Sequence, residues 1–117
     1  MSIFVRARFD VPRQQRPRFE ELLRVLCAQA RQEPGTLTYR WFFAGEGGYV
    51  VLEEYADTAA AVTHNERAAD LLRQVGACAE MTQAEIYGTP GPEILDWAHR
   101  HPRVTTYPDL HTPDPAT

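Results

Sequence analysis

Two aromatic-rich segments separated by a glycine-rich turn constrain the fold more than any other feature of this chain. Residues 36–43 and 49–56 consist largely of β-branched and aromatic residues, which favour strands. Residues 45–48 read Gly-Glu-Gly-Gly, and glycine allows the chain to reverse sharply. The pattern therefore predicts an antiparallel hairpin with residues 44–48 as its loop.

The register of this hairpin decides which side chains share a face of the sheet. With that loop, one face carries the cross-strand pairs Phe43–Tyr49, Trp41–Val51, Tyr39–Glu53 and Leu37–Tyr55. The other face carries Phe42, Arg40 and Thr38 opposite Val50, Leu52 and Glu54. A slip of one residue would exchange the two sets, so this register is a hypothesis.

The remaining elements follow from periodicity. Residues 3–10 alternate as a strand, and a helical apolar stripe begins at Pro17 and ends at Glu33-Pro34-Gly35. A helical region extends from about residue 58 to Gly76, with a break near Asn65, and a strand covers residues 78–87. The order β-α-β-β-α-β predicts an α+β protein with the ferredoxin-like split βαβ arrangement and an antiparallel sheet.

The chain changes character after Gly88. Six of its nine prolines fall between Pro90 and Pro115, and only residues 93–100 favour a short helix. We therefore divide the chain into a domain, residues 1–88, and a proline-rich C-terminal arm, residues 89–117. The arm carries enough apolar residues up to about Leu110 to pack on the body or on a partner.

Composition excludes several function classes. A net charge of -4 without a basic patch argues against a nucleic-acid partner, and no segment reaches the ~20 apolar residues of a membrane span. The N-terminus lacks a signal pattern, and Cys27 and Cys78 have no metal-ligand spacing. We expect a cytoplasmic protein without a metal site.

A homodimer is expected because both faces of the sheet carry large apolar side chains. Two helices cover only one face, which leaves an apolar patch on the other: Phe4, Phe42, Val50 and Leu52. Two such faces packed together with twofold symmetry would bury it.

Three stretches together point to a family. Residues 33–39 read Glu-Pro-Gly-Thr-Leu-Thr-Tyr, residues 53–57 read Glu-Glu-Tyr-Ala-Asp, and His64 follows on a predicted helix. This layout resembles the antibiotic biosynthesis monooxygenase (ABM) domain family over roughly residues 3–88. The resemblance implies a dimeric α+β barrel that oxygenates aromatic substrates without metal or flavin, so no cofactor is expected. It also implies a pocket between sheet and helices within each subunit.

His64 and Glu53 are the candidate catalytic bases. His64 stands nine residues after Tyr55, as in a spacing frequent in the family, and imidazole accepts protons near neutral pH. Alternatively, it is a histidine at a helix end bonded to structure. Glu53 lies on an aromatic face that would desolvate it. Its alternative is an ion pair with Arg6 or Arg40, which the register places on the opposite face.

The candidate substrate-binding residues surround these bases. Aromatic rings on one face provide a stacking platform for a flat ligand, or simply a core: Tyr39, Trp41, Tyr49 and Tyr55. Val51 lies on the expected pocket floor, and Asn65 either orients a carbonyl or marks a helix break. The resemblance implies that the antibiotic-pathway enzymes use an asparagine, a tryptophan and a tyrosine at the positions where this chain has Val51, Tyr55 and Ala61. The hydrogen bonds made by those three residues therefore cannot operate unchanged here.

The resulting prediction is a cofactor-independent monooxygenase. Its substrates would be dioxygen and a small aromatic, quinol, anthrone or polyketide-type molecule. Two alternatives stay open: an isomerase or cyclase that uses the same pocket base, and a small-molecule-binding protein without turnover.

Overall fold

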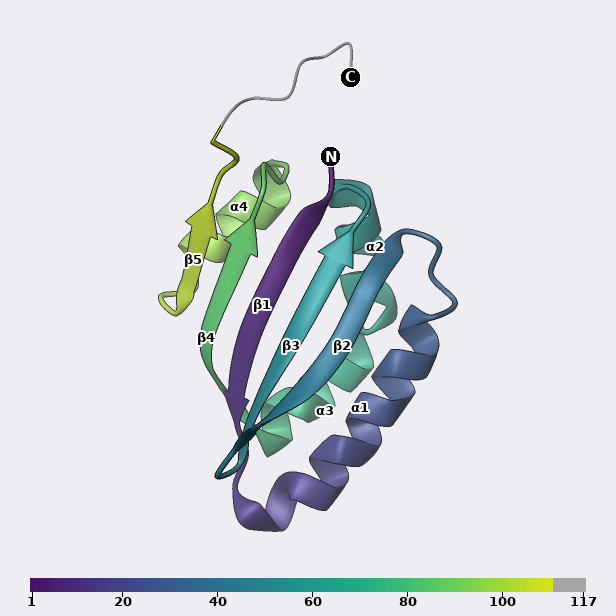
Figure 1. Ribbon diagram of the computed structural model, residues 1–117, viewed down its shortest axis with the longest axis vertical. Helices are drawn as coiled ribbons and strands as arrows, with labels where there is room; N and C mark the ends of the chain where they lie inside the picture. Colours follow the sequence, from purple (N-terminus) through teal and green to yellow (C-terminus); the bar gives the residue numbers. More distant parts are fainter. Residues whose placement is uncertain (111–117) are drawn as a thin grey trace.

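A five-stranded sheet forms the centre of the protein. The computed structural model describes residues 1–110. The strands are β1 (Ile3–Asp10), β2 (Thr36–Gly45), β3 (Gly48–Tyr55), β4 (Glu80–Tyr87) and β5 (Val104–Tyr107). Their order is β2-β3-β1-β4-β5, and each pair of neighbours is antiparallel except β4 and β5 (Figure 1).

The helices cover one face of this sheet (Figure 1). They are the short 3-10 helix η1 (Arg13–Gln15), followed by α1 (Arg16–Ala30), α2 (Thr58–Arg67), α3 (Ala69–Cys78) and α4 (Pro92–His99). The order of β1 to β4 and the helices between them is the ferredoxin-like one, which confirms the predicted α+β class.

The predicted hairpin register is confirmed over most of its length. Phe43 lies opposite Tyr49, Trp41 opposite Val51 and Tyr39 opposite Glu53. The prediction is wrong at the far end, where an irregularity between Thr36 and Thr38 sets Thr36 opposite Tyr55 and leaves Leu37 54% exposed.

The loop of the hairpin is shorter than predicted. Strand β2 continues to Gly45 and β3 begins at Gly48. This is possible because Gly45, Glu46 and Gly47 all adopt positive φ angles of 77°, 49° and 81°. Glycine enters this region without strain, so the chain reverses within few residues.

Three further boundaries differ from the sequence prediction. The break in the second helical region falls at Ala68 and not near Asn65, and Gly76 lies inside α3. The fourth strand begins at Glu80, because Cys78 still belongs to α3. The strand β5 was not predicted at all.

The main core lies between the sheet and α1 and α3. Phe19 is fully buried, and its ring contacts those of Phe9, Trp41 and Tyr49 at centroid distances of 6.1, 5.7 and 4.8 Å. The apolar stripe of α1 supplies the buried residues Phe19, Leu22, Leu23, Leu26 and Ala30. This packing fixes α1 against β2 and so sets the position of the loop between them.

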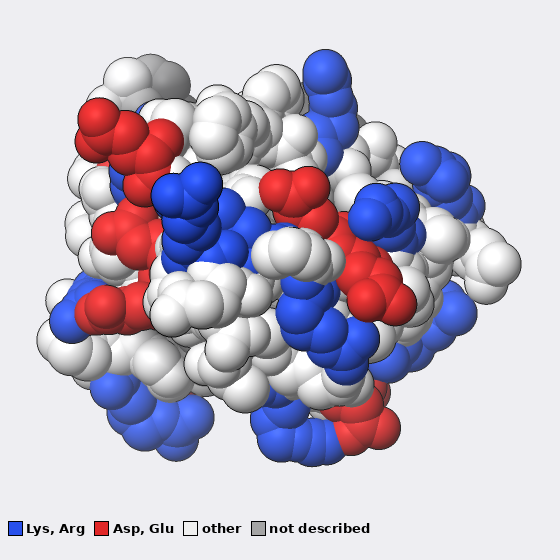
Figure 2. Space-filling model, turned by 90° about the horizontal axis from the view of Figure 1, so that it is seen from below, with Lys and Arg blue, Asp and Glu red and all other residues white. Residues whose placement is uncertain are grey.

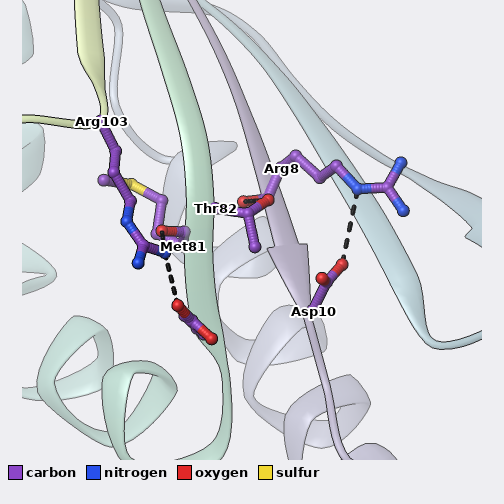
Figure 3. Close-up of polar contacts among 6 residues, drawn as sticks. Arg8, Asp10, Met81, Thr82 and Arg103 are labelled. Carbon is purple, nitrogen blue, oxygen red and sulfur yellow. Dashed lines mark hydrogen bonds and ion pairs between the residues drawn. The ribbon is translucent and has the colours of Figure 1, made fainter.

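Residues 92–107 add a helix and an edge strand to the sheet. Ile94 and Ala98 of α4 and Val104 of β5 pack against Ile3 and Ile86. In addition, the Arg103 guanidinium pairs with Glu80 and donates to the Met81 carbonyl at 3.4 Å (Figure 3). On the neighbouring strand, the Arg8 carbonyl accepts from the Thr82 hydroxyl and the Arg8 guanidinium pairs with Asp10 (Figure 3). Strand β5 pairs with residues 84–87 of β4 and so covers that edge of the sheet.

The other face of the sheet remains open. Phe4, Phe42 and Leu52 on it are 48%, 39% and 39% exposed. A mainly apolar concavity of about 490 Å³ lies there, and its lining includes Phe4, Arg6, Leu52 and Tyr87.

By contrast, acidic and basic side chains are interspersed on the end of the molecule seen in Figure 2. Among residues 1–110 no helix is both long and apolar enough to cross a membrane.

Candidate functional site

A cluster of polar and aromatic side chains lies between the sheet and α2. Strand β3 contributes Glu53 and Tyr55, and β2 contributes Tyr39. Helix α2 contributes His64, and the loop that follows α1 contributes Glu33. The structure thus brings both predicted bases together with two of the predicted aromatic residues. It adds the Glu33 carboxylate, which sequence reasoning placed in a helix stop and in a family-like stretch but gave no role in the site.

Local sequence determines how α2 presents its histidine. The Asp57 side chain accepts a hydrogen bond from the Ala60 backbone N–H at 2.8 Å, which caps the helix. Ala61 and His64, three residues apart, then share the buried face of α2. The small Ala61 leaves room for the sheet, so His64 in the last turn points inward.

A glycine lets the Glu33 loop approach the same helix. A Cβ atom at Gly35 would lie 2.5 Å from the Ala60 Cβ, closer than two carbon atoms can approach. The Gly35 carbonyl also accepts a hydrogen bond from the Ala56 N–H at 2.8 Å, just before α2 begins. These two contacts hold the loop and the helix together and bring Glu33 to His64.

His64 is almost completely buried, with 2% of its surface exposed. Its Nδ1 lies 2.7 Å from the Glu33 Oε1. The centroid of its ring lies 5.1 Å from that of Tyr39 and 5.4 Å from that of Tyr55. The imidazole is therefore held between a carboxylate and two tyrosine rings.

Glu33 is a buried carboxylate with several partners. Its Oε1 accepts a hydrogen bond from the Thr36 hydroxyl at 2.8 Å, and its Oε2 lies 3.6 Å from the Arg67 Nη1. Burial acts to raise the pKa of Glu33, but the hydrogen bonds from His64 and Thr36 and the charges of His64 and Arg67 outweigh burial and lower it. Glu33 is therefore ionised at neutral pH.

Glu53 has the opposite character. Burial raises the pKa of its carboxyl, and the hydrogen bond from the Tyr55 hydroxyl and the charge of His64 only partly oppose this. The residue as a whole is nevertheless partly exposed, and it is among those that line the concavity of about 490 Å³. The site thus holds two carboxyl groups, Glu33 and Glu53, whose surroundings shift their pKa values in opposite directions.

The ion pair considered as the alternative for Glu53 is not present. Arg6 pairs with Glu85 at 2.6 Å, and the Arg40 guanidinium lies 5.1 Å from the centroid of the Phe42 ring. Both arginines project from the opposite face of the sheet, as the register predicted.

The remaining predicted residues divide into near and distant ones. Burial raises the pKa of Tyr39 and Tyr55 well above the ordinary tyrosine value, so both hydroxyls stay protonated. Trp41 lies beside Tyr39 at 6.3 Å between ring centroids, and its buried Nε1 donates to no partner within residues 1–110. Val51 is buried and packs with Ala7 and Ala84 beneath these rings.

Tyr49 and Asn65 lie outside this group. The Tyr49 hydroxyl donates to the Glu20 Oε2 at 2.5 Å, and burial followed by that bond raises its pKa to about 12. It belongs to the core beneath α1. Asn65 is exposed although it is adjacent to the buried His64, because successive residues of a helix point in different directions.

Comparison with known proteins identifies the family. The model of the antibiotic biosynthesis monooxygenase family matches residues 2–84. The chain belongs to this family. The match covers β1 to β4 and α1 to α3 almost completely and contains every residue of the cluster described above. It ends before α4 and β5.

Solved structures show the same fold. MupZ from Pseudomonas fluorescens is 21% identical, with a TM-score of 0.75, and the match covers 99% of this chain and 97% of MupZ. A Caulobacter crescentus protein named for the ABM family is 28% identical, with a TM-score of 0.63 and coverage of 73% and 84%. SnoaB, a cofactor-independent oxygenase from Streptomyces nogalater solved as an asparagine-to-alanine mutant, is 15% identical, with a TM-score of 0.64 and coverage of 73% and 89%.

These comparisons differ in how much of the chain they include. The MupZ match spans α4 and β5, which the family model leaves out. A search of curated proteins found no match to this sequence. Within residues 1–110, no group of three or more histidine, cysteine or acidic side chains is placed to hold a metal ion.

Proposed function

We propose that this protein is a cofactor-independent monooxygenase that acts on a small aromatic, anthrone- or quinol-type substrate. Membership of the ABM family supports this class of reaction. The observation that carries the proposal is the pairing of a proton acceptor and a proton donor on one face of the sheet. His64, bonded to the ionised Glu33, is the acceptor, and Glu53 with its raised pKa is the donor.

The reaction needs no electron source other than its substrate. His64 takes a proton from the acidic carbon of an anthrone-type CH2 group and leaves an electron-rich anion. The anion reduces dioxygen and forms a carbon–oxygen bond, which gives a hydroperoxide. Loss of water from the hydroperoxide yields a carbonyl, so CH2 and O2 become C=O and H2O.

Glu53 and Tyr55 stabilise the anion. Because burial favours the protonated form of Glu53, its carboxyl can donate a hydrogen bond to the developing oxyanion while it accepts one from Tyr55. A protonated carboxylic acid beside a tyrosine is suited to this role in an apolar site. Tyr39 and Trp41 hold the ring of the substrate, and the Trp41 Nε1 supplies a further donor.

A second candidate function uses the same acid and base without oxygen. Proton transfer from one carbon to His64 and from Glu53 to another atom would make the protein an isomerase or cyclase. The opposed pKa shifts of Glu33 and Glu53 favour this possibility as much as they favour oxygenation. It would be recognised by deuterium uptake into substrate from D2O under anaerobic conditions.

The working unit is proposed to be a homodimer. The open face exposes Phe4, Phe42 and Leu52 around the concavity of about 490 Å³, and a second copy would cover them. The His64 cluster itself lies on the other face of the sheet, between the strands and α2.

Oxygen uptake tests the proposal. A panel of anthrones and hydroquinols is incubated with the wild type and with His64→Ala, Glu53→Ala and Glu21→Gln. Glu21 is an exposed residue of α1 paired with Arg18 at 3.7 Å, so its variant serves as a control for loss of a carboxylate. We expect uptake in the wild type and the control, and a loss of about 100-fold in the two site variants. Substrate binding without uptake or deuterium exchange would instead indicate a binding protein without turnover.

A further inference from the structure

Glu33 stands out because carboxylates are rarely buried without a specific reason. It is 7% exposed and lies in the short loop between α1 and β2. Its backbone is fixed on both sides: its N–H donates to the Ala30 carbonyl and its own carbonyl accepts from the Thr36 N–H, each at 3.1 Å. The side chain therefore has little freedom to move away from its partners.

The bonds of this carboxylate determine which nitrogen of His64 carries a proton. Glu33 is ionised, because the hydrogen bonds from His64 and Thr36, together with the nearby Arg67 charge, oppose the effect of burial and lower its pKa. An ionised carboxylate only accepts hydrogen bonds, so the His64 Nδ1, 2.7 Å from Oε1, must donate. In the neutral imidazole, the other nitrogen, Nε2, then has a free lone pair.

We propose that Glu33 is a positioning residue: it holds the His64 imidazole in the Nδ1–H tautomer and in a fixed orientation, so that Nε2 is the proton acceptor of the site. That Nε2 acts on a substrate rests on the proposed function; the tautomer and its dependence on Glu33 do not. The same division of labour, in which a buried carboxylate orients a histidine through Nδ1, occurs in serine hydrolases on unrelated folds.

The surroundings of Glu33 favour this role over that of a simple ion pair. Arg67 is 43% exposed and 3.6 Å from Oε2, a distance beyond normal hydrogen bonding. The two short contacts, those of His64 and Thr36, both converge on Oε1. The carboxylate is thus aligned for the histidine by the threonine, while the arginine contributes mainly charge.

The tautomer can be measured directly. The protein, whose four histidines include His64, is labelled with 15N-histidine, and long-range proton–nitrogen correlations are recorded at about pH 9, where an imidazole is neutral. His64→Gln assigns the signal. In the wild type we expect Nδ1 protonated and Nε2 unprotonated. An Nε2–H tautomer in the wild type would overturn the proposal without any need for a variant.

Three variants test whether Glu33 is the cause. Glu33→Ala removes the acceptor and should abolish the preference for Nδ1–H. Glu33→Gln keeps an oxygen that can accept from Nδ1 while it loses the charge, so it should retain the tautomer. Glu21→Gln, the surface control, should leave the signal unchanged. Retention of Nδ1–H in a folded Glu33→Ala protein would contradict the proposal.

Turnover separates this inference from the proposed function. Because Glu33 does not reach the substrate, Glu33→Ala should lower kcat about 10- to 100-fold with little change in KM. Turnover equal to the wild type in a Glu33→Ala protein that has lost the tautomer would overturn the positioning role in catalysis. Full turnover by His64→Ala would instead reject the proposed base, while the measured tautomer would still establish the Glu33–His64 pairing.

Discussion

A double-mutant cycle on Glu33 and His64 measures how strongly the site holds its own histidine. Removing His64 leaves the buried Glu33 carboxylate with the Thr36 hydroxyl and the more distant Arg67. Removing one hydrogen-bond partner of a buried group costs about 1–3 kcal/mol of unfolding free energy, and more when that group is charged, as the Glu33 carboxylate is. Glu33→Ala strands a buried N–H of His64 and costs about 1–3 kcal/mol.

The two losses should not add. A hydrogen bond that involves a charged group contributes about 1.5–3 kcal/mol, and the 2.7 Å contact exists only when both residues are present. The double variant should therefore be more stable than the sum of the single losses predicts, by about that amount. The measurement is urea unfolding of the four proteins at about pH 7. Additivity within about 0.5 kcal/mol would refute the reasoning, because independent sites behave in that way.

The same interaction predicts how stability depends on pH. The pKa of Glu33 is lower in the folded protein than in the unfolded chain, where a glutamate titrates near its ordinary value of about 4.3. The stabilisation is therefore complete above that pH and is lost as the pH falls through the folded value. The unfolding free energy of the wild type should fall more steeply than that of Glu33→Ala below about pH 5. Parallel curves would mean that folding leaves the pKa of Glu33 unchanged, which would contradict the lowered folded value.

Three further predictions concern the surroundings of the site. Burial raises the pKa of Glu53 in the folded protein, so the wild type should lose stability as the pH rises above the pKa of an unfolded glutamate. The urea midpoint of Glu53→Gln relative to the wild type should therefore be higher at about pH 8 than at about pH 4. An equal difference in midpoint at the two pH values would count against a desolvated carboxyl. Gly35→Ala should cost about 1–3 kcal/mol and lower turnover, because the added Cβ would clash with Ala60 and displace the Glu33 loop from α2; calorimetry with an unchanged Tm would disprove that contact. Leu52→Lys should convert a dimer to monomers in sedimentation, whereas Val25→Lys, at an apolar α1 residue of similar exposure, should not; dimers in both would place the interface elsewhere.

The sequence was sufficient to predict the hairpin and the faces of its strands. The alternation of Tyr39, Trp41 and Phe43 with polar and apolar neighbours has a period of two, and it determined the register that the structure confirms. Such a pattern is local, so it can be recognised without knowledge of the rest of the fold. The irregularity at Leu37 could not be recognised in this way, because it alters the pairing without changing the composition of the strand.

The features missed from the sequence depend on contacts between distant residues. Strand β5 has only four residues and pairs in parallel with β4 after a helical crossover, so no hairpin signal indicates it. Glu33 lies 31 residues before His64, and only the packing of its loop against α2 buries it. The one available signal was that Glu33 opens the first of the stretches that resemble the ABM family.

Labelled dioxygen tests the central claim most directly. The wild type and His64→Ala are incubated with an anthrone under 18O2, without added metal, flavin or reductant, and the product is analysed by mass spectrometry. The proposed mechanism predicts a product that carries one 18O atom, formed about 100-fold more slowly by the variant. A product that is formed above the uncatalysed rate without 18O, or at the same rate by both proteins, would contradict an oxygenase that depends on His64.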